Sequence, residues 1–274
     1  PAERPGRRYA DGMIIEGGTP HRLILFTFDD GPDRRTTPLL LDRLDEAGVK
    51  AVFFLTASRL RGTTQAEREQ AALAREIHAR GHVIGSHTVD HQQLPLLDEQ
   101  GLLEQVRGAD ALFERALGFA PALFRPPGGA HSPRTDNFLA AHGYTSVLWN
   151  IGTGDFQVNS AHQVFDTFVK VLERREREYG ERGGIVLMHD TYAWSVDAFQ
   201  MIHAELWRRN CQLLERGEEL YEVVSDLSLF YQPRGDAGGS AVAEPARLAP
   251  AELEARQARL RVEAAQRCHA TDGL

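Results

Sequence analysis

The chain has 274 residues, a formal net charge of -8 and 42% hydrophobic residues, values that are ordinary for a globular protein with a sizeable core. The acidic balance argues against nucleic acid or an anionic membrane as the main partner, and no apolar run approaches the roughly 18 residues that span a bilayer. No signal peptide is visible, and two cysteines, Cys211 and Cys268, permit at most one internal disulfide.

Short β-rich segments alternate with longer amphipathic segments over most of the chain. The expected strands cover residues 23–28, 51–55, 82–85, 122–124, 145–149, 184–188 and 220–224. The expected helices cover residues 36–47, 66–80, 98–117, 132–142, 161–178 and 196–216. This alternation predicts βαβ units around a parallel sheet, and about seven units favour a distorted (β/α)7-type barrel. No dinucleotide-binding glycine fingerprint follows the first strand, which disfavours a Rossmann fold.

Composition divides the chain into three expected parts. Residues 1–22 form a lead-in, residues 23–232 form the main domain, and residues 233–274 form a linker and a tail helix. The linker is rich in Gly, Ala, Pro and Arg. The tail helix carries only a thin apolar stripe, so we interpret it as a frayed or docked tail; the stripe consists of Leu253, Leu260 and Ala264.

Acids, histidines and an arginine follow the expected strands. In parallel α/β folds, the residues after each strand meet at one edge of the sheet, where ligands bind. The strand exits read DD at 29–30, SHTVDH at 86–91, RPPGG at 125–129, WNIGTGDF at 149–156 and LMHD at 187–190. These residue types bind metal ions and transfer protons, so the sequence predicts a reactive site at this edge.

Two of these exits together predict a metal centre. Asp29 and Asp30 are adjacent, and adjacent carboxylates disfavour each other's ionisation unless a positive group compensates. His87 and His91 are four residues apart, which on a helical turn places both imidazoles on one face. Two histidines and one carboxylate bind a catalytic metal ion and leave positions open for water. One acid would then bind the metal and the other would remain a free base; the alternative is two solvated loop histidines.

The ordered segments TFDDGP, SHTVDH, RPPGG, GTGDF and LMH resemble the motifs of the polysaccharide deacetylase family, the NodB-homology group of metal-dependent carbohydrate esterases. The resemblance runs from about residue 23 to about residue 224, so it implies a NodB-like catalytic domain over residues 23–232. It implies a hydrolase that removes N-acetyl groups from a polysaccharide containing N-acetylglucosamine, with bacterial peptidoglycan as the expected substrate.

The resemblance also implies roles for individual residues. Asp30, His87 and His91 resemble the metal ligands, and Asp29 resembles the general base. Arg125 resembles the arginine that pairs with this base and keeps it ionised. A structural ion pair between Arg125 and Asp155 is the alternative.

A second set of residues resembles the acid and the substrate contacts. His189 resembles the general acid that protonates the leaving amine, and Asp155 resembles an acid that flanks the groove. The expected substrate contacts are the backbone N–H of Gly128, the wall at Leu187, and the rings of Phe156 and Trp194. Gly128 and Phe156 depart from the family, which often has an aromatic residue at the first position and Trp at the second. Trp194 could instead fill a hydrophobic loop.

The resemblance implies one divalent metal ion, with Zn expected first and Co, Ni or Fe as alternatives. It implies an N-acetylated glycan as partner and export to the periplasm or cell envelope; we expect a monomer without a membrane span. Export would allow a disulfide between Cys211 and Cys268, against the alternative of two unrelated thiols. The functional alternatives are a deacetylase of chitin oligomers, poly-GlcNAc or acetyl-xylan, a cyclic-amide hydrolase, and a non-catalytic glycan-binding relative.

Overall fold

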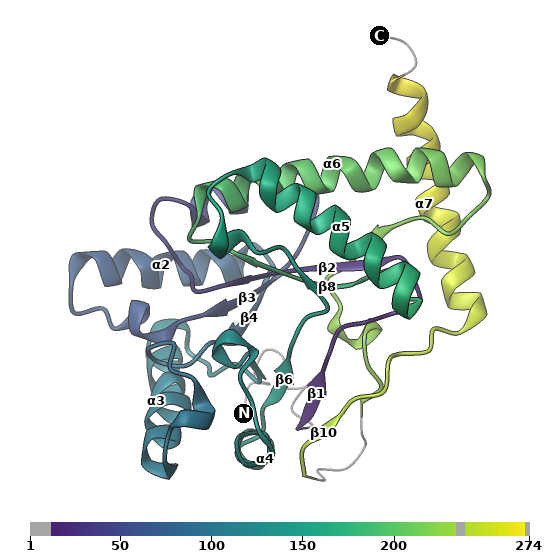
Figure 1. Cartoon of the computed structure of the whole chain (residues 1–274). Helices are drawn as coiled ribbons and strands as arrows, with labels where there is room; N and C mark the ends of the chain where they lie inside the picture. Colours follow the sequence, from purple (N-terminus) through teal and green to yellow (C-terminus); the bar gives the residue numbers. More distant parts are fainter. Residues whose placement is uncertain (1–11, 234–238, 272–274) are drawn as a thin grey trace.

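Parallel strands form one curved sheet at the centre of the molecule (Figure 1). The computed structural model describes residues 12–233 and 239–271, so parts of the expected lead-in and linker lie outside the described residues. The order along the sheet is β10-β1-β6-β5-β4-β3-β2-β8-β7, with β9 beside β2. The strands are β1 (Met13–Ile15), β2 (Leu23–Asp29), β3 (Val52–Leu55), β4 (Val83–Ser86), β5 (Leu123–Phe124), β6 (Thr145–Val147), β7 (Ile151–Gly152), β8 (Gly184–His189), β9 (Glu222–Val223) and β10 (Ala241–Val242).

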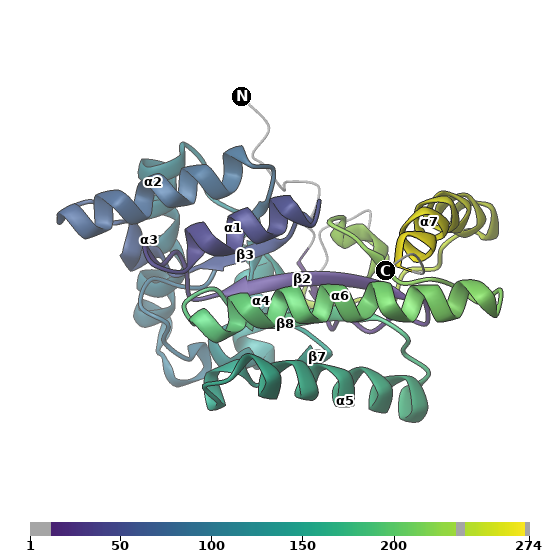
Figure 2. The same ribbon diagram turned by 90° about the horizontal axis from the view of Figure 1, so that it is seen from above.

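The sheet curls into an open, distorted barrel, which confirms the predicted fold class. All the strand pairs are parallel, and β7 and β10 are the two ends of the path. The helices are α1 (Thr37–Glu46), α2 (Gln65–Ala79), α3 (Glu99–Leu117), α4 (Pro133–Ala141), α5 (Ala161–Tyr179), α6 (Ala193–Glu215) and α7 (Pro250–Thr271). Helices α5 and α6 run side by side along β2 and β8 (Figure 2). Among the described residues, no helix combines the length and the apolarity that crossing a bilayer requires.

The core forms because the inner strands are almost wholly apolar. Strand β2 reads LILFTFD, and each of its residues is buried. The rings of Phe26 and Phe28 pack edge-on against Phe199 of α6, with centroids 5.0 and 6.4 Å apart. Burial of one such ring stabilises the fold by roughly 1.5–3 kcal/mol, so these contacts hold α6 against β2. The polar residues of β2, Thr27 and Asp29, are buried as well and belong to the site described below.

Two strands occur where the sequence predicted only a lead-in and a linker. Strand β1 falls within residues 1–22 and pairs with β6, and β10 falls within residues 233–274 and pairs with β1. Both strands are too short to show the alternation by which strands are predicted. They therefore extend one edge of the sheet without a recognisable sequence pattern.

The expected strand over residues 145–149 was too long. Strand β6 ends at Val147, and β7 begins at Ile151. The carbonyls of Val147 and Leu148 accept hydrogen bonds from the side chain of Arg125. Because an arginine takes up these backbone acceptors, the chain leaves the sheet here.

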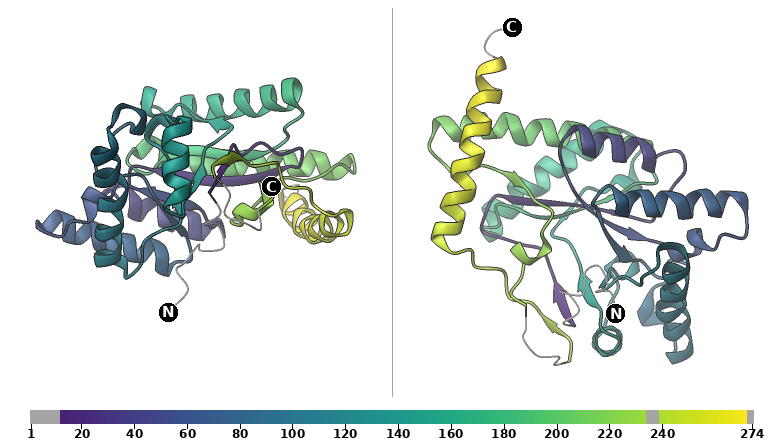
Figure 3. Two further views of the ribbon diagram at one scale, coloured as in Figure 1. Left: turned by 90° about the horizontal axis from the view of Figure 1, so that it is seen from below. Right: turned by 180° about the vertical axis from the view of Figure 1, so that it is seen from behind.

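The tail helix α7 docks on the barrel and crosses the end of α6 (Figure 3). Two residues of the predicted stripe, Leu260 and Ala264, are buried. The side chain of Gln257 hydrogen-bonds both the N–H and the carbonyl of Leu220. A thin apolar stripe is sufficient because these polar contacts and a disulfide supplement it.

We predict that Cys211 and Cys268 are oxidised in the purified protein. The structure joins them in a disulfide whose Cα atoms are 5.7 Å apart, between positions separated by 57 in the sequence. Closing a loop of this length contributes about 4 kcal/mol in the chain-entropy model. Thiol titration of denatured, unreduced protein should find no free thiol, and replacing both cysteines by serine should lower the midpoint of thermal unfolding. Two free thiols per chain would contradict the link.

A buried histidine precedes β4. His82 is 2% exposed, and its Nδ1 accepts a hydrogen bond from the N–H of Ala51 at 3.1 Å. Its ring packs edge-on against Phe53. Burial lowers the pKa of His82 to about 4, and the nearby charges modify this effect; they are Lys50, Asp45 and Arg80. The folded protein therefore holds this imidazole neutral at physiological pH.

We predict that His82 makes the fold sensitive to acid. An unfolded histidine has a pKa of about 6.5, so below this pH the unfolded chain binds a proton more readily than the folded chain. The stability is complete above about pH 6.5 and falls towards pH 4 by up to about 1.4 kcal/mol per pH unit. In His82→Gln, the amide oxygen can still accept the N–H of Ala51, so urea unfolding should show a flatter pH profile. Parallel profiles for the variant and the parent would refute this assignment.

Candidate active site

The polar residues of the inner strands meet around a buried arginine. Arg125 directly follows β5, and its guanidinium donates hydrogen bonds to Asp29 Oδ1 at 2.8 Å and to Thr27 Oγ1 at 2.7 Å. The ring of Phe54 lies 4.2 Å from the guanidinium carbon. A buried charge is stable only when it is paired and hydrogen-bonded, so Arg125 and Asp29 hold each other in place. Burial raises the pKa of Asp29, and the positive charge of Arg125 counteracts this effect.

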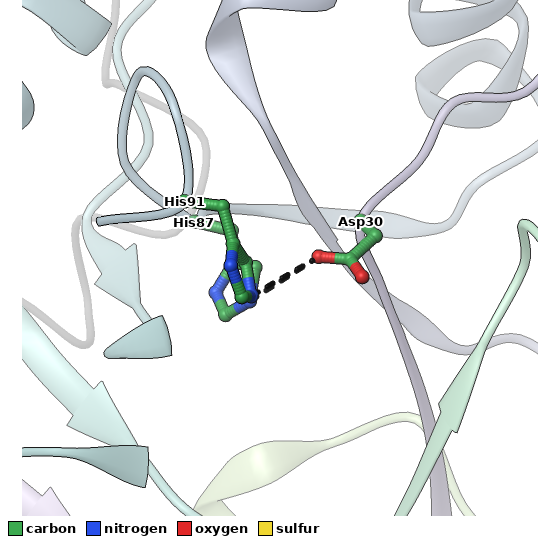
Figure 4. Close-up of side chains that lie close together, drawn as sticks. All are labelled: Asp30, His87 and His91. Carbon is green, nitrogen blue, oxygen red and sulfur yellow. Dashed lines mark ion pairs between the residues drawn. The ribbon is translucent and has the colours of Figure 1, made fainter. Parts of the chain in front are cut away.

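A second group gathers at the carboxyl ends of β2 and β4. Figure 4 shows the imidazoles of His87 and His91 facing the carboxylate of Asp30. Asp30 Oδ1 lies 3.6 Å from His87 Nε2 and 3.5 Å from His91 Nε2, and the three atoms are close enough together to hold one metal ion. The same Oδ1 atom is buried and has no hydrogen-bond partner among the described residues.

The hydrogen bonding of this group fits a cation. The Nδ1 of His87 hydrogen-bonds the carbonyl of Arg125 at 2.7 Å, which leaves the lone pair of a neutral ring on Nε2, facing Asp30. Burial lowers the pKa of His87 to about 3, so the ring is neutral. An imidazole lone pair and a carboxylate oxygen repel each other unless a positive ion lies between them. Two imidazoles and one carboxylate form the ligand set of an open catalytic metal site.

The backbone adopts an unusual conformation at this group. Among the described residues other than glycine, φ is positive at Asp30, Thr88 and His91, with values of 74°, 67° and 59°. Hydrogen bonds hold two of them: the N–H of Asp30 donates to the carbonyl of Phe54, and the N–H of His91 donates to Thr88 Oγ1. The expected helical turn is absent here; a turn over residues 88–90 brings the rings of the two histidines 4.9 Å apart.

His189 ends β8 and lies beside the second oxygen of Asp30. Its Nε2 is 3.9 Å from Asp30 Oδ2, and its Nδ1 is 2.8 Å from Asp155 Oδ1. Asp155 also accepts hydrogen bonds from the N–H of His189 and the hydroxyl of Ser195, each at 2.7 Å. Burial opposes protonation of His189, but the hydrogen bond and charge of Asp155, together with the charges of Asp29 and Asp30, raise its pKa to about 9.

Aromatic rings surround this histidine. The centroids of Phe156 and Tyr192 lie 5.7 and 5.8 Å from the ring of His189, and Phe156 is 54% exposed. Trp194 stacks on Tyr192 and donates its indole N–H to the carbonyl of Asp155. The exposed Phe156 is therefore available to a ligand, whereas Trp194 supports the loop that carries Asp155.

The remaining candidates lie around the same edge of the sheet. Gly128 is exposed and has a φ of 63°, in the loop after Arg125. Leu187 is buried in β8, two residues before His189. His131, which lies three residues after Gly128, forms a hydrogen bond with Asp136 at 2.9 Å and takes no part in the group at Asp30.

Comparisons with known proteins agree with this geometry. A family model described as polysaccharide deacetylase matches residues 16–147. The peptidoglycan-N-acetylglucosamine deacetylase of Bacillus cereus is 30% identical over 187 residues, which cover 67% of this chain and 62% of the relative. This match and the named relatives support placing the chain in the polysaccharide deacetylase family.

Chitin deacetylases of the same family are also similar to this chain. The enzyme of Pestalotiopsis sp. is 32% identical over 185 residues, 68% of this chain and 59% of the relative. The solved chitin deacetylase of Colletotrichum lindemuthianum aligns with a TM-score of 0.65 and 27% identity, covering 78% of this chain and 89% of that one. The matched part spans about three fifths of the length of the Bacillus and Pestalotiopsis proteins. Members of the family are metal-dependent, and Asp30, His87 and His91 form a possible site for the ion.

The structure decides how the charged residues of this site are paired. Arg125 pairs with Asp29, while Asp155 pairs with His189, so the alternative ion pair between Arg125 and Asp155 does not form. The two pairs are neighbours in the sheet, because Asp29 of β2 is the register partner of His189 of β8.

Three supporting residues were missed in the sequence. Thr27 is a polar residue within an apolar run, and Asp190 directly follows His189. These positions could have identified both residues as part of the site. Asp190 is fully buried and accepts a hydrogen bond from the hydroxyl of Thr37. Ser195 lies 40 positions from Asp155, and nothing in the sequence links the two residues.

We predict that one divalent ion binds at Asp30, His87 and His91. The variant His91→Ala should lose the ion on dialysis, because a carboxylate and one imidazole bind it far more weakly than three ligands. Elemental analysis of the purified variants measures this loss. The control is His131→Ala, which removes a nearby histidine and should retain the ion. Equal metal content in the two variants would show that the ion binds elsewhere.

Proposed function

We propose that this protein removes N-acetyl groups from a polysaccharide containing N-acetylglucosamine, with peptidoglycan as the polymer. The observation that carries the proposal is the arrangement around Asp30: a carboxylate–arginine pair and a histidine–carboxylate pair lie beside a group able to hold a metal. The names of the relatives support it, because they are peptidoglycan and chitin deacetylases. Residues 23–232 are the proposed catalytic domain.

The proposed ligands of the metal are Asp30, His87 and His91. When bound, a divalent ion such as Zn²⁺ would polarise the acetamide carbonyl and acidify the attacking water. The unpartnered Asp30 Oδ1, which faces two imidazole nitrogens, supports this assignment. Co, Ni and Fe suit the same ligand set.

Asp29 is the proposed general base. As a water oxygen adds to the acetamide carbon, Asp29 Oδ2 accepts a proton from that water. Its Oδ1 is occupied by Arg125, while Oδ2 lies 3.7 Å from His87 Nε2 and so faces the metal group. Arg125 therefore positions the base and keeps it ionised.

His189 is the proposed general acid. It donates its Nε2 proton to the amide nitrogen as the C–N bond breaks, which releases acetate and the free amine. Asp155 holds Nδ1 of the ring and so directs Nε2 towards the centre of the site. The backbone N–H of Gly128 is the proposed donor to the developing oxyanion, in an exposed loop that a substrate can reach.

The other proposed substrate contacts are apolar. Leu187 forms the wall for the acetyl methyl group. Phe156 provides an exposed ring next to His189 on which a sugar can stack. Trp194 contributes by holding Tyr192 and the Asp155 loop. A non-catalytic glycan-binding protein would not need the buried pairs at Asp29 and His189, and their retention favours catalysis.

The proposed location is outside the cytoplasm, in the periplasm or cell envelope. The polymer named for the Bacillus cereus relative is an extracellular one. The disulfide between Cys211 and Cys268 suits an oxidising compartment.

We predict that the metal-loaded protein releases acetate from N-acetylated glycans and that Asp29→Asn lowers this rate by roughly 100-fold or more, the usual contribution of a general base. The asparagine keeps the shape of the side chain but cannot accept the proton. A panel of peptidoglycan fragments, chitin oligomers, poly-GlcNAc and acetyl-xylan, with enzymatic detection of acetate, measures the rates and ranks the polymers.

Two further measurements make this test specific. A cyclic amide in the same panel tests the alternative hydrolase. Metal analysis of Asp29→Asn should show full occupancy, because Asp30 and not Asp29 is the proposed ligand. Absence of acetate from every glycan would refute the proposed function. Loss of metal in Asp29→Asn would show that Asp29 is the metal ligand and would make Asp30 the candidate base.

A further inference from the structure

A polar cavity of about 370 Å³ opens beside the proposed metal ligands. It is lined by Asp30, Thr56, Ser58, Arg59, Asp90 and His91. Because Asp30 and His91 belong to both, the cavity is continuous with the site of the reaction. The four other residues belong neither to the metal group nor to the pairs at Asp29 and His189.

The arginine of this cavity is held in a fixed place. Arg59 lies in the short 3-10 helix η2 (Ala57–Leu60), which follows β3. The N–H groups of Ala57 and Ser58 donate to the carbonyls of Thr88 and Val89, each at 2.9 Å. These bonds attach η2 to the turn that carries His91. The side chain of Arg59 is 32% exposed, so its guanidinium is partly ordered by the protein and still open to a ligand.

The guanidinium of Arg59 has N–H groups available for further hydrogen bonds. Among the described residues, its only ion-pair contact is Asp33 Oδ2 at 4.0 Å, which is too long for a hydrogen bond. Asp33 is itself engaged through its other oxygen by the backbone N–H and side chain of Arg35. An arginine with five donors that makes no short contact to a carboxylate can bind an external anion.

The acids in the cavity face other groups of the protein. Asp90 pairs with Arg61 at 3.1 Å and also contacts the side chain of Gln105. Asp30 faces the two histidines of the metal group. Arg59 is therefore the charge that the cavity presents to a ligand, and a carboxylate is its best-matched partner.

We propose that Arg59 binds a carboxylate on the sugar next to the N-acetylated sugar that reacts, so that the cavity is a subsite for acidic glycans. This inference rests on the proposed function and narrows its substrate. In peptidoglycan, every second sugar carries a lactyl ether that ends in a carboxyl group, whereas chitin has no such group. The subsite favours strands in which that carboxylate is free over chitin of the same length.

Two tetrasaccharides test this subsite, because they differ only in the lactyl ethers. One alternates N-acetylglucosamine with N-acetylmuramic acid, and the other is chitotetraose. Their binding is measured by calorimetry on the metal-loaded protein in the Asp29→Asn background, which suppresses turnover. Arg59→Gln should weaken binding of the acidic tetrasaccharide about 10-fold, the usual effect of losing one hydrogen-bonded charge pair, and change binding of chitotetraose less than about 2-fold.

Matched variants separate this effect from a general change of charge. Arg59→Lys keeps the charge and should recover most of the affinity for the acidic tetrasaccharide. The control is Arg34→Gln, because Arg34 is exposed, pairs with Glu69 at 2.8 Å and does not line the cavity. It should leave the affinities for both glycans unchanged. Methyl esterification of the lactyl groups should reproduce the effect of Arg59→Gln on the unmodified protein.

The outcomes distinguish this inference from the proposed function. Unchanged discrimination in Arg59→Gln, or equal losses for both glycans, overturns the subsite even if acetate is released by the parent protein. Discrimination that depends on Arg59, without acetate release from any glycan, supports the subsite and refutes the proposed catalysis. Failure of the parent to bind either tetrasaccharide overturns the subsite as well.

Discussion

The buried pair between Arg125 and Asp29 is the interaction on which the rest of the site depends. Arg125 is fully enclosed, and its guanidinium bonds Asp29, Thr27 and the carbonyls after β6, so it connects the middle of the sheet across the barrel. Burying the guanidinium without these partners would destabilise the fold by several kcal/mol. The positions of β2, β5 and β6 therefore depend on this one side chain. The carbonyl of Arg125 also orients His87. The proposed base and one proposed metal ligand therefore share one support.

The two adjacent acids coexist because the backbone sends them to different partners. Asp29 is the last residue of β2 and lies in register with Phe54 and His189, so its side chain points into the barrel towards Arg125. Asp30 is beyond the strand, and its positive φ turns its side chain towards His87 and His91. The charge of Asp29 is compensated by Arg125 within the protein, and the carboxylate of Asp30 is available to a bound cation. This division gives neighbouring residues different chemical environments.

The edges of the barrel are completed by segments whose sequences have weak hydrophobic patterns. Strands β1 and β10 extend one edge, and α7 covers α6 with few apolar contacts and a disulfide. These segments gain stability from elements that already exist, which is why short strands and a thin stripe suffice. Asp29, Asp30 and His189 lie at the ends of β2 and β8, which are long and strongly apolar, so the positions of these three residues are well supported.

The sequence by itself determined the parallel α/β class, the inner strands and the set of polar residues at their ends, because these follow from local hydrophobic periodicity and from motif order. It predicted that one of the two acids would bind a metal ion and that the other would remain a free base. Only the tertiary structure decided that Asp155 holds His189, that Ser195 supports Asp155, and that positive φ values rather than a helical turn bring His87 and His91 together. The two contacts of Asp155 join residues 34 and 40 positions apart, which the sheet and the packing of α6 bring together. The approach of His87 and His91 depends on positive φ values that no local sequence pattern encodes.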